Sequence, residues 1–144
     1  MSREYPPRPI VGIGIVVLRG DAVLLVRRGH PPGLGSWALP GGAQELGETA
    51  EAAARRELHE ETGLTVGALT LVAHVDSIHR DAEARVRYHY TILDFAAHWT
   101  GGEPAAGADA AAAGFFADTT PEFRGLWTEA HRVITRARAL LTAG

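Results

Sequence analysis

The amino-acid sequence predicts an α/β fold in which pairs of strands flank one helix and a second helix ends the chain. Two observations lead to this prediction: runs of β-branched residues are separated by turns, and two segments have helical character. The chain has 144 residues, of which 46% are hydrophobic and 22% are charged, and this is enough for one domain with a sizeable core. We therefore expect a single domain over residues 1–144.

Strand character begins directly after a short proline-rich arm. Ile10–Arg19 is β-branched with interspersed glycines, as expected of a buried strand, and Ala22–Arg28 follows a Gly-Asp turn as its partner. Residues 69–78 and 86–97 are two further strand candidates, separated by a polar stretch. Residues 100–114 are rich in Gly and Ala and predict a flexible loop that leads into a short strand, "FFA".

Ala50–Thr62 is expected to form a helix because it contains neither Gly nor Pro and is rich in Ala, Glu and Arg. Thr49 is placed to cap its start, Glu51 complements the positive end of the helix dipole, and Gly63 suits the C-terminal end. The chain ends in a second, amphipathic helix over residues 126–141. A flank of small or apolar residues can press the first helix onto a sheet: Ala50, Ala53, Ala54 and Leu58.

Composition excludes several classes of function. The formal net charge is −3, so no overall field attracts DNA, RNA or an anionic membrane. Cysteine is absent, which excludes disulfides, zinc–thiolate sites and a thiol nucleophile. The apolar runs are shorter than the ~20 residues of a membrane span, and the N-terminus lacks the basic start of a signal peptide. We expect a cytoplasmic protein that binds neither nucleic acid nor membrane.

Six glutamates lie within the 26-residue stretch "LPGGAQELGETAEAAARRELHEETGL". Glu57, Glu60 and Glu61 are spaced so that all three project from one face of the expected helix within about one turn. Converging carboxylates raise one another's pKa unless a cation neutralises them, and hard divalent ions prefer oxygen ligands. Gly41 and Gly42 allow close approach of the backbone, so a main-chain carbonyl can add a ligand. The stretch is therefore either a metal site or a solvated, Glu-rich helix face.

The spacing of residues within this stretch decides between a metal site and a solvated helix face. Gly42 is followed after five residues by Glu48, and after seven more by "RELHEETGL", which runs from Arg56 to Leu64. This resembles the Nudix box, G-x5-E-x7-R-E-U-x-E-E-x-G-U, where U is a bulky aliphatic residue; every fixed position is filled and both U positions are leucine. By this resemblance, which covers residues 10–117, the chain is identified as a member of the Nudix hydrolase superfamily, in its nucleotide pyrophosphohydrolase or ADP-ribose pyrophosphatase-like branch.

The resemblance implies a mixed β-sheet sandwiched between helices and a reaction that depends on Mg²⁺ or Mn²⁺. Glu60 is the first candidate for the base that activates water, Arg56 would pair with a metal-bound glutamate, and Glu48 would orient that cluster. The metal ligands that the resemblance implies are Glu57, Glu61, Glu60 and the backbone carbonyl of Gly41.

Each candidate residue outside the box has two interpretations. Some branches of the superfamily draw the base or a further metal ligand from a loop, and Asp109 and Glu103 lie in such a loop here; otherwise they are solvated loop carboxylates. Arg27 and Arg28 can reach a phosphate from the end of their strand, or they can be ordinary surface residues. Trp37 can stack on a nucleobase, although aromatic side chains near strands more often belong to the core.

The resemblance implies hydrolysis of a nucleoside diphosphate linked to another moiety, so the expected partner is a small nucleotide. Compact size and the strand "RYHYTIL" favour a nucleoside triphosphate, cleaved to monophosphate and pyrophosphate. ADP-ribose, or another nucleoside diphosphate sugar, is the alternative; the proline that marks many ADP-ribose hydrolases about sixteen residues past the box is replaced near there by Arg80. A non-catalytic nucleotide sensor is the alternative from a different class. Many relatives dimerise, so a homodimer is possible.

Overall fold

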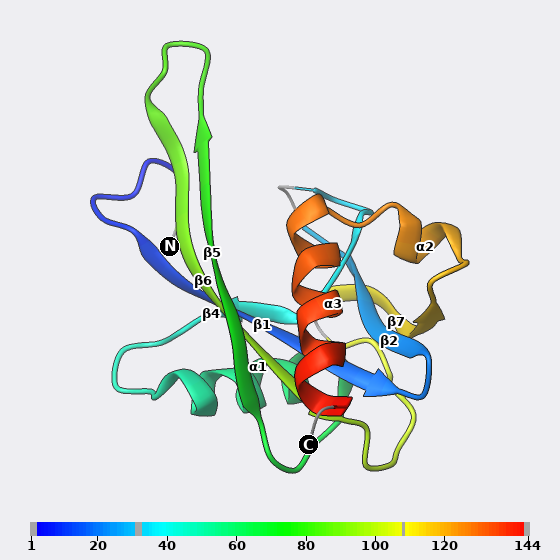
Figure 1. Ribbon diagram of the computed structural model, residues 1–144. Coiled ribbons are helices and arrows are strands. Elements are labelled where there is room, and N and C mark those ends of the chain that lie inside the picture. Colours follow the sequence, from blue (N-terminus) through cyan, green and yellow to red (C-terminus); the bar gives the residue numbers. More distant parts are fainter. Residues whose placement is uncertain (1–2, 31–32, 108, 143–144) are drawn as a thin grey trace.

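The computed structural model describes residues 3–30, 33–107 and 109–142. In these residues seven strands form one mixed sheet with the order β3-β2-β1-β6-β5, while β4 pairs with β1 and β7 with β2 (Figure 1). The strands are β1 (Ile10–Arg19), β2 (Ala22–Arg28), β3 (Trp37–Ala38), β4 (Gly41–Ala43), β5 (Thr70–Arg80), β6 (Val86–His98) and β7 (Ala110–Ala117). The helices are α1 (Ala50–Thr62), α2 (Pro121–Arg124) and α3 (Thr128–Thr142).

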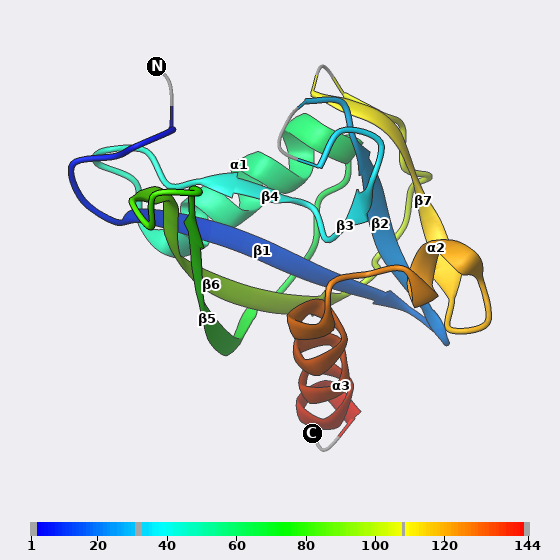
Figure 2. The same ribbon diagram turned by 90° about the horizontal axis from the view of Figure 1, so that it is seen from above.

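The sheet is covered on both faces, because successive residues of its central strand point to opposite sides. Ile13, Ile15 and Val17 of β1 pack in the core beneath α1, whereas Val16 and Leu18 pack beneath α3. Figure 2 shows α1 and α3 on opposite sides of the sheet. The predicted α/β/α arrangement is therefore confirmed.

Helix α1 begins and ends where the sequence predicts. The hydroxyl of Thr49 accepts a hydrogen bond from the N–H of Ala52 at 3.0 Å. Gly63 adopts the left-handed conformation, with φ of 75°, and its N–H donates to the carbonyl of His59 at 2.8 Å. Ala53, Ala54 and Leu58 are buried against the sheet, as expected for the small-residue flank.

The prediction of a loop over residues 100–114 is wrong at its C-terminal end. Ala110–Ala117 forms β7, which pairs along β2 in antiparallel fashion. A run of alanines carries no alternation of apolar and polar residues, so the strand arises from pairing with a distant segment that local sequence cannot show. Strands β3 and β4 and helix α2 are too short for any periodic signal. The final helix begins at Thr128, two residues later than expected.

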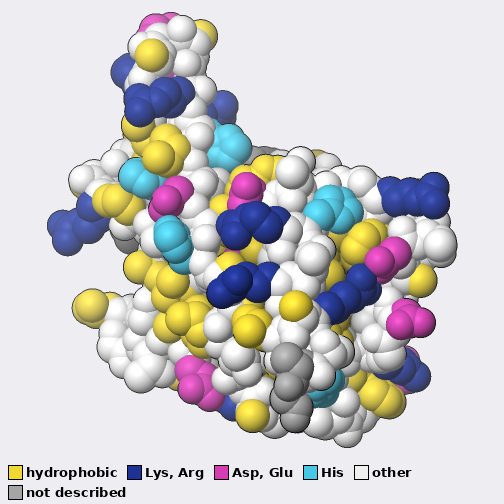
Figure 3. Space-filling view, viewed as in Figure 1, with side chains coloured by type: hydrophobic (Ala, Val, Ile, Leu, Met, Phe, Trp, Pro, Cys, Tyr) yellow, Lys and Arg dark blue, Asp and Glu magenta, His cyan; other side chains and the backbone are white. Residues whose placement is uncertain are grey.

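Helix α3, with 15 residues, is the longest helix of the described residues, and none of the helices there has the length and apolar character to cross a membrane. On the face shown in Figure 3, basic, acidic and His side chains are interspersed over α3 and the long β5–β6 hairpin.

Candidate active site

Strand β4 places the backbone beside the acidic face of α1. In the antiparallel register of β4 with β1, the backbone groups of Gly41 and Ala43 point away from β1 and toward α1. The N–H of Gly41 donates to Oε2 of Glu61 at 2.9 Å, and the carbonyl of Ala43 accepts from Nη2 of Arg56 at 3.0 Å. The N–H and carbonyl of one strand residue point to the same side, so the Gly41 carbonyl also faces these carboxylates.

Both glycines of β4 are required by close contacts rather than by an unusual φ. A Cβ at Gly41 would lie 1.9 Å from the carbonyl oxygen of Ile13, and a Cβ at Gly42 would lie 2.4 Å from the carboxyl carbon of Glu57. A side chain at Gly41 would push β4 away from β1, and one at Gly42 would displace the Glu57 carboxylate. Gly41 therefore permits the close pairing of β4 with β1, and Gly42 leaves room for the acidic side chain of α1.

Arg56 is the centre of a hydrogen-bonded cluster. Its Nε and Nη2 donate to the two carboxylate oxygens of Glu48 at 2.7 and 2.9 Å, which is a bidentate pairing. Its Nη1 donates to Glu57 at 2.8 Å and to the more exposed Glu60 at 3.2 Å. One guanidinium thus fixes the positions of three of the predicted site carboxylates.

The pKa values of the site carboxylates are shifted in different directions. Hydrogen bonds from Arg56 lower the pKa of Glu48 to about 2. Burial raises the pKa of Glu57, although Arg56 opposes that shift. Burial raises the pKa of Glu61 to about 7. The hydrogen bond from the N–H of Gly41 opposes this shift, whereas the negative charges of Glu57 and Asp109 add to it. Keeping the ionised carboxylates of Glu57 and Glu61 side by side therefore lowers the stability of the metal-free fold.

The donor set fits a hard divalent cation. In the described residues, no group of three acidic or His side chains forms a preformed metal site. Arg56 lies between the carboxylates that it binds and keeps them apart. Glu57 and Glu61 nevertheless offer partly buried oxygens whose raised pKa values a cation would relieve, beside the carbonyl of Gly41. Mg²⁺ and Mn²⁺ both prefer such oxygen ligands.

The two loop carboxylates lie in different places. The N–H of Gly107 donates to the backbone carbonyl of Glu61 at 2.9 Å, so the loop is fastened to the end of α1. Asp109 follows in this loop, lies 3.0 Å from Nε2 of His30, and adds its negative charge to the environment of Glu61. The structure therefore brings Asp109 to the site.

Glu103 pairs with the last residue of β1. Its carboxylate accepts a hydrogen bond from Arg19 at 3.2 Å. Arg19 is five residues beyond Gly14, the β1 residue that pairs with Gly41, and five strand residues span ~17 Å. The structure does not bring Glu103 together with the carboxylates of α1.

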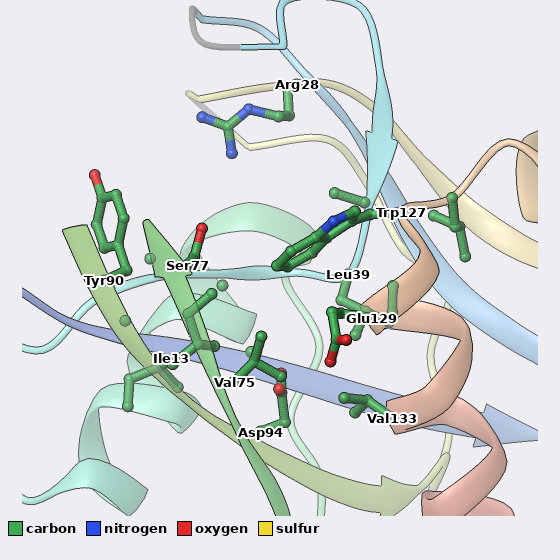
Figure 4. Close-up of a pocket in the computed structure, with 18 of the residues that line it drawn as sticks. Ile13, Arg28, Leu39, Val75, Ser77, Tyr90, Asp94, Trp127, Glu129 and Val133 are labelled. Carbon is green, nitrogen blue, oxygen red and sulfur yellow. The ribbon is translucent and has the colours of Figure 1, made fainter. Parts of the chain in front are cut away.

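A pocket of about 310 Å³ opens on the α3 side of the sheet, next to β4. Its volume is at the lower end of the range for small-molecule sites, and aromatic and apolar side chains dominate its walls. Figure 4 shows Arg28 at one end, Asp94 at the other, and Trp127 beside the space between them. The lining includes Gly12, Gly14, Arg28, Trp37, Leu39, Gly41, Gly42, Val75, Ser77, Tyr88, Tyr90, Ile92, Asp94, Trp127 and Val133.

Of the two candidate arginines, Arg28 lines the pocket and Arg27 does not. Arg27 packs over the ring of Trp37 instead, 6.0 Å from its centroid, while Trp37 itself faces the pocket and contacts Phe116 edge-on. A register shift in the pairing of β2 with β7 falls between the two arginines.

Sequence reasoning did not single out Asp94 or Trp127. The signal for Asp94 is a lone charged residue inside the apolar strand "TILDFAA". The signal becomes meaningful only when the parallel pairing of β6 with β1 sets Asp94 opposite Gly14. Trp127 precedes α3 and is 50% exposed, which is a large exposed fraction for a tryptophan.

Comparison with known proteins gives the class to which this fold and site belong. Residues 8–139 match the NUDIX domain family. The chain is 40% identical to an ADP-ribose pyrophosphatase of Methanocaldococcus jannaschii over 108 residues, which are 75% of this chain and 62% of that protein. It is 42% identical over 98 residues to a Mycobacterium tuberculosis protein provisionally named 8-oxo-dGTP diphosphatase 2, covering 67% of this chain and 65% of that protein.

Among solved structures, the MutT NUDIX hydrolase from Burkholderia pseudomallei is 32% identical and superposes with a TM-score of 0.75, over 90% of this chain and 98% of that one. The chain therefore belongs to the NUDIX family, as its sequence motif indicates. It spans less than two thirds of the length of the M. jannaschii and M. tuberculosis relatives.

Proposed function

We propose that the protein is a divalent-metal-dependent hydrolase that cleaves a nucleoside diphosphate linked to another moiety. The leading reaction is hydrolysis of a nucleoside triphosphate by water to a monophosphate and pyrophosphate. One observation carries the proposal: Gly41 and Gly42 line an aromatic pocket, and the carboxylates of Glu57 and Glu61 lie directly against these glycines. A base and a pyrophosphate would thus be held beside the acidic helix.

Glu57, Glu61, Glu60 and the Gly41 carbonyl would hold Mg²⁺ or Mn²⁺. A bound divalent ion neutralises pyrophosphate oxygens and lowers the pKa of a coordinated water. Arg56 and Glu48 are positioning residues, because their hydrogen bonds hold the Glu57 carboxylate in place.

The protein's own groups supply the proton transfer and the phosphate contacts. Glu60 is our first assignment for the base that takes a proton from the attacking water, because 55% of its side chain is exposed at the edge of the cluster. Asp109 is the second assignment, since its loop is fastened to α1. Arg28 faces the pocket and suits a phosphate, and Trp37 offers an aromatic wall for the base.

ADP-ribose is the second candidate substrate, cleaved to AMP and ribose 5-phosphate. The 40% identity to an ADP-ribose pyrophosphatase of M. jannaschii favours it. The proposal places the activity in a single domain over residues 1–144, with a small nucleotide as partner and a cytoplasmic location; the homodimer stays a prediction.

The test is a turnover panel with Mg²⁺ and with Mn²⁺. It contains the common and oxidised nucleoside triphosphates, ADP-ribose and dinucleoside polyphosphates. Glu57→Gln and Glu61→Gln should abolish turnover, whereas Glu51→Gln, on the exposed side of the same helix, should leave it unchanged. Pyrophosphate release identifies the triphosphate reaction and ribose 5-phosphate identifies the alternative. Nucleotide binding without turnover of any of these would refute the proposal and indicate a sensor.

A further inference from the structure

The buried end of the pocket carries an acidic side chain that the proposed chemistry does not use. Asp94 of β6 is only 4% exposed and lines the pocket between Val75 and Val133 (Figure 4). It lies directly over Gly14, where a Cβ would come within 2.1 Å of the Asp94 Oδ1. The glycine of β1 therefore makes the room that this carboxyl occupies.

The Asp94 carboxyl is not satisfied by the protein itself. Across the described residues, no N–H or O–H group donates a hydrogen bond to it. Burial raises its pKa to about 6, and only the charge of Arg132 opposes that shift. Arg132 is in turn paired with Glu129 at 2.8 Å. Among the described residues no fully buried side-chain oxygen lacks a partner, so the unpaired oxygens of Asp94 are open to the pocket that this residue lines. Carboxyls of this kind concentrate where a ligand supplies the missing donors.

The walls of the pocket suit a flat heterocycle. Trp127 lies on one side of the pocket and Tyr90 on the other, while Val75 and Val133 are apolar (Figure 4). Enzymes read a base held out of a helix by stacking it between such side chains and by hydrogen bonds to its Watson–Crick edge. Arg28 lies at the opposite end of the pocket (Figure 4), and the two glycines of β4 line the pocket beside the acidic helix. A nucleotide with its phosphates at the acidic helix would present its base to Asp94.

The chemistry of the carboxyl selects among the bases. At neutral pH the group is mainly ionised, and an ionised carboxylate can only accept hydrogen bonds. The Watson–Crick edge of guanine offers two adjacent donors, N1–H and the N2 amino group, which match the two oxygens of one carboxylate. Adenine and cytosine each offer one donor next to a lone pair, and uracil and thymine place one N–H between two carbonyls. Each of these edges would set an acceptor against a carboxylate oxygen.

We propose that Asp94 recognises a guanine base by accepting hydrogen bonds from its N1–H and N2 amino group, so that guanine nucleotides are the preferred substrate class. Guanine oxidised at C8 keeps this edge and belongs to the same class. The inference rests on the proposed function for the placement of the phosphates, but the assignment of the base rests on the pocket alone.

Binding of nucleoside monophosphates to the metal-free protein tests the assignment without turnover. Isothermal titration with GMP, IMP and AMP at about pH 8 keeps Asp94 ionised. A bidentate contact to a base discriminates by roughly 10- to 100-fold, so GMP should bind that much more tightly than AMP. IMP, which keeps N1–H but lacks the amino group, should fall between them.

Asp94→Asn has nearly the same shape and replaces one acceptor with a donor. It should weaken GMP binding by roughly 10-fold or more and bring the GMP and AMP affinities close together. Asp21→Asn, the same substitution in the exposed turn between β1 and β2, should change neither affinity.

Equal binding of GMP and AMP by the parent protein, or an unchanged GMP-to-AMP ratio in Asp94→Asn, would overturn the assignment. Failure of the hydrolase proposal and failure of the guanine assignment give different results. A protein that prefers GMP but hydrolyses nothing in the turnover panel contradicts the hydrolase alone. A protein that hydrolyses ADP-ribose without preferring GMP contradicts the guanine assignment alone.

Discussion

Replacing Glu61 should make the metal-free protein more stable while it removes metal binding. Burial raises the pKa of the Glu61 carboxyl to about 7 from an ordinary 4.5, so the folded state holds this proton more tightly than the unfolded state does. Stability therefore falls as the pH rises from 4.5 to about 7, where the folded carboxyl ionises. A neutral side chain of the same shape avoids this loss.

The magnitude follows from the two pKa values. Two and a half pH units at about 1.4 kcal/mol each give at most about 3.5 kcal/mol. Gln retains an oxygen that can accept the Gly41 N–H. Glu61→Gln should therefore raise the Tm at about pH 8 by up to roughly 10 °C, and should change it little near pH 4.5. Mg²⁺ at a hundred times its Kd should stabilise the parent protein by about 2.7 kcal/mol and leave the variant unchanged, so that the gap closes.

Thermal denaturation in EDTA and in Mg²⁺, from about pH 4.5 to about pH 8.5, measures these changes. Glu51→Gln is the control, because that glutamate is exposed on the same helix and pairs with Arg55. A lower Tm for Glu61→Gln than for the parent in EDTA at the high pH would refute the reasoning. A difference in Tm between Glu61→Gln and the parent protein that stays constant across the pH range would refute the reasoning equally.

Three further variants test other parts of the structure. Arg56→Lys keeps the charge but loses its bidentate hydrogen bonds, so metal affinity, measured by titrating turnover with Mg²⁺, should fall roughly 10- to 100-fold; an unchanged titration would contradict this. Gly42→Ala puts a Cβ 2.4 Å from the carboxyl carbon of Glu57 and should lower kcat roughly 100-fold in steady-state assays, with normal kcat as the contrary result. Arg138→Ala removes two hydrogen bonds to Asp118 and should cost about 1 kcal/mol in urea denaturation without affecting turnover.

The sequence predicts best what is encoded locally. The caps of α1 depend on Thr49 and Gly63 alone, and the continuous burial along most of Ile10–Arg19 follows from its β-branched pattern. The Nudix spacing likewise puts Glu57 and Glu61 on one helix face, because residues four apart are neighbours on a helix surface. These features need only neighbours within a turn or two of the chain.

Features that depend on pairing between distant segments escape such reasoning. Strand β7 is an alanine run whose pairing with β2 has no local signature. Arg28 and not Arg27 lines the pocket, and this depends on where β2 lies in the sheet. The role of Asp94 requires β6 to lie beside β1, so that Gly14 opens a space for its carboxyl. The pocket is thus a property of the sheet topology, whereas the acidic helix is a property of the sequence motif.

The pocket and the acidic helix share one physical arrangement. Glu61 beside one end of the pocket and Asp94 at the other both have pKa values raised by burial, to about 7 and about 6. In contrast, Glu48 beside Arg56 has its pKa lowered to about 2, because its partner lies within the protein. Carboxylates whose partner is internal stabilise the fold, whereas those whose partner is a ligand weaken it until the ligand binds. A metal ion beside Glu61 and a base beside Asp94 would therefore each add stability.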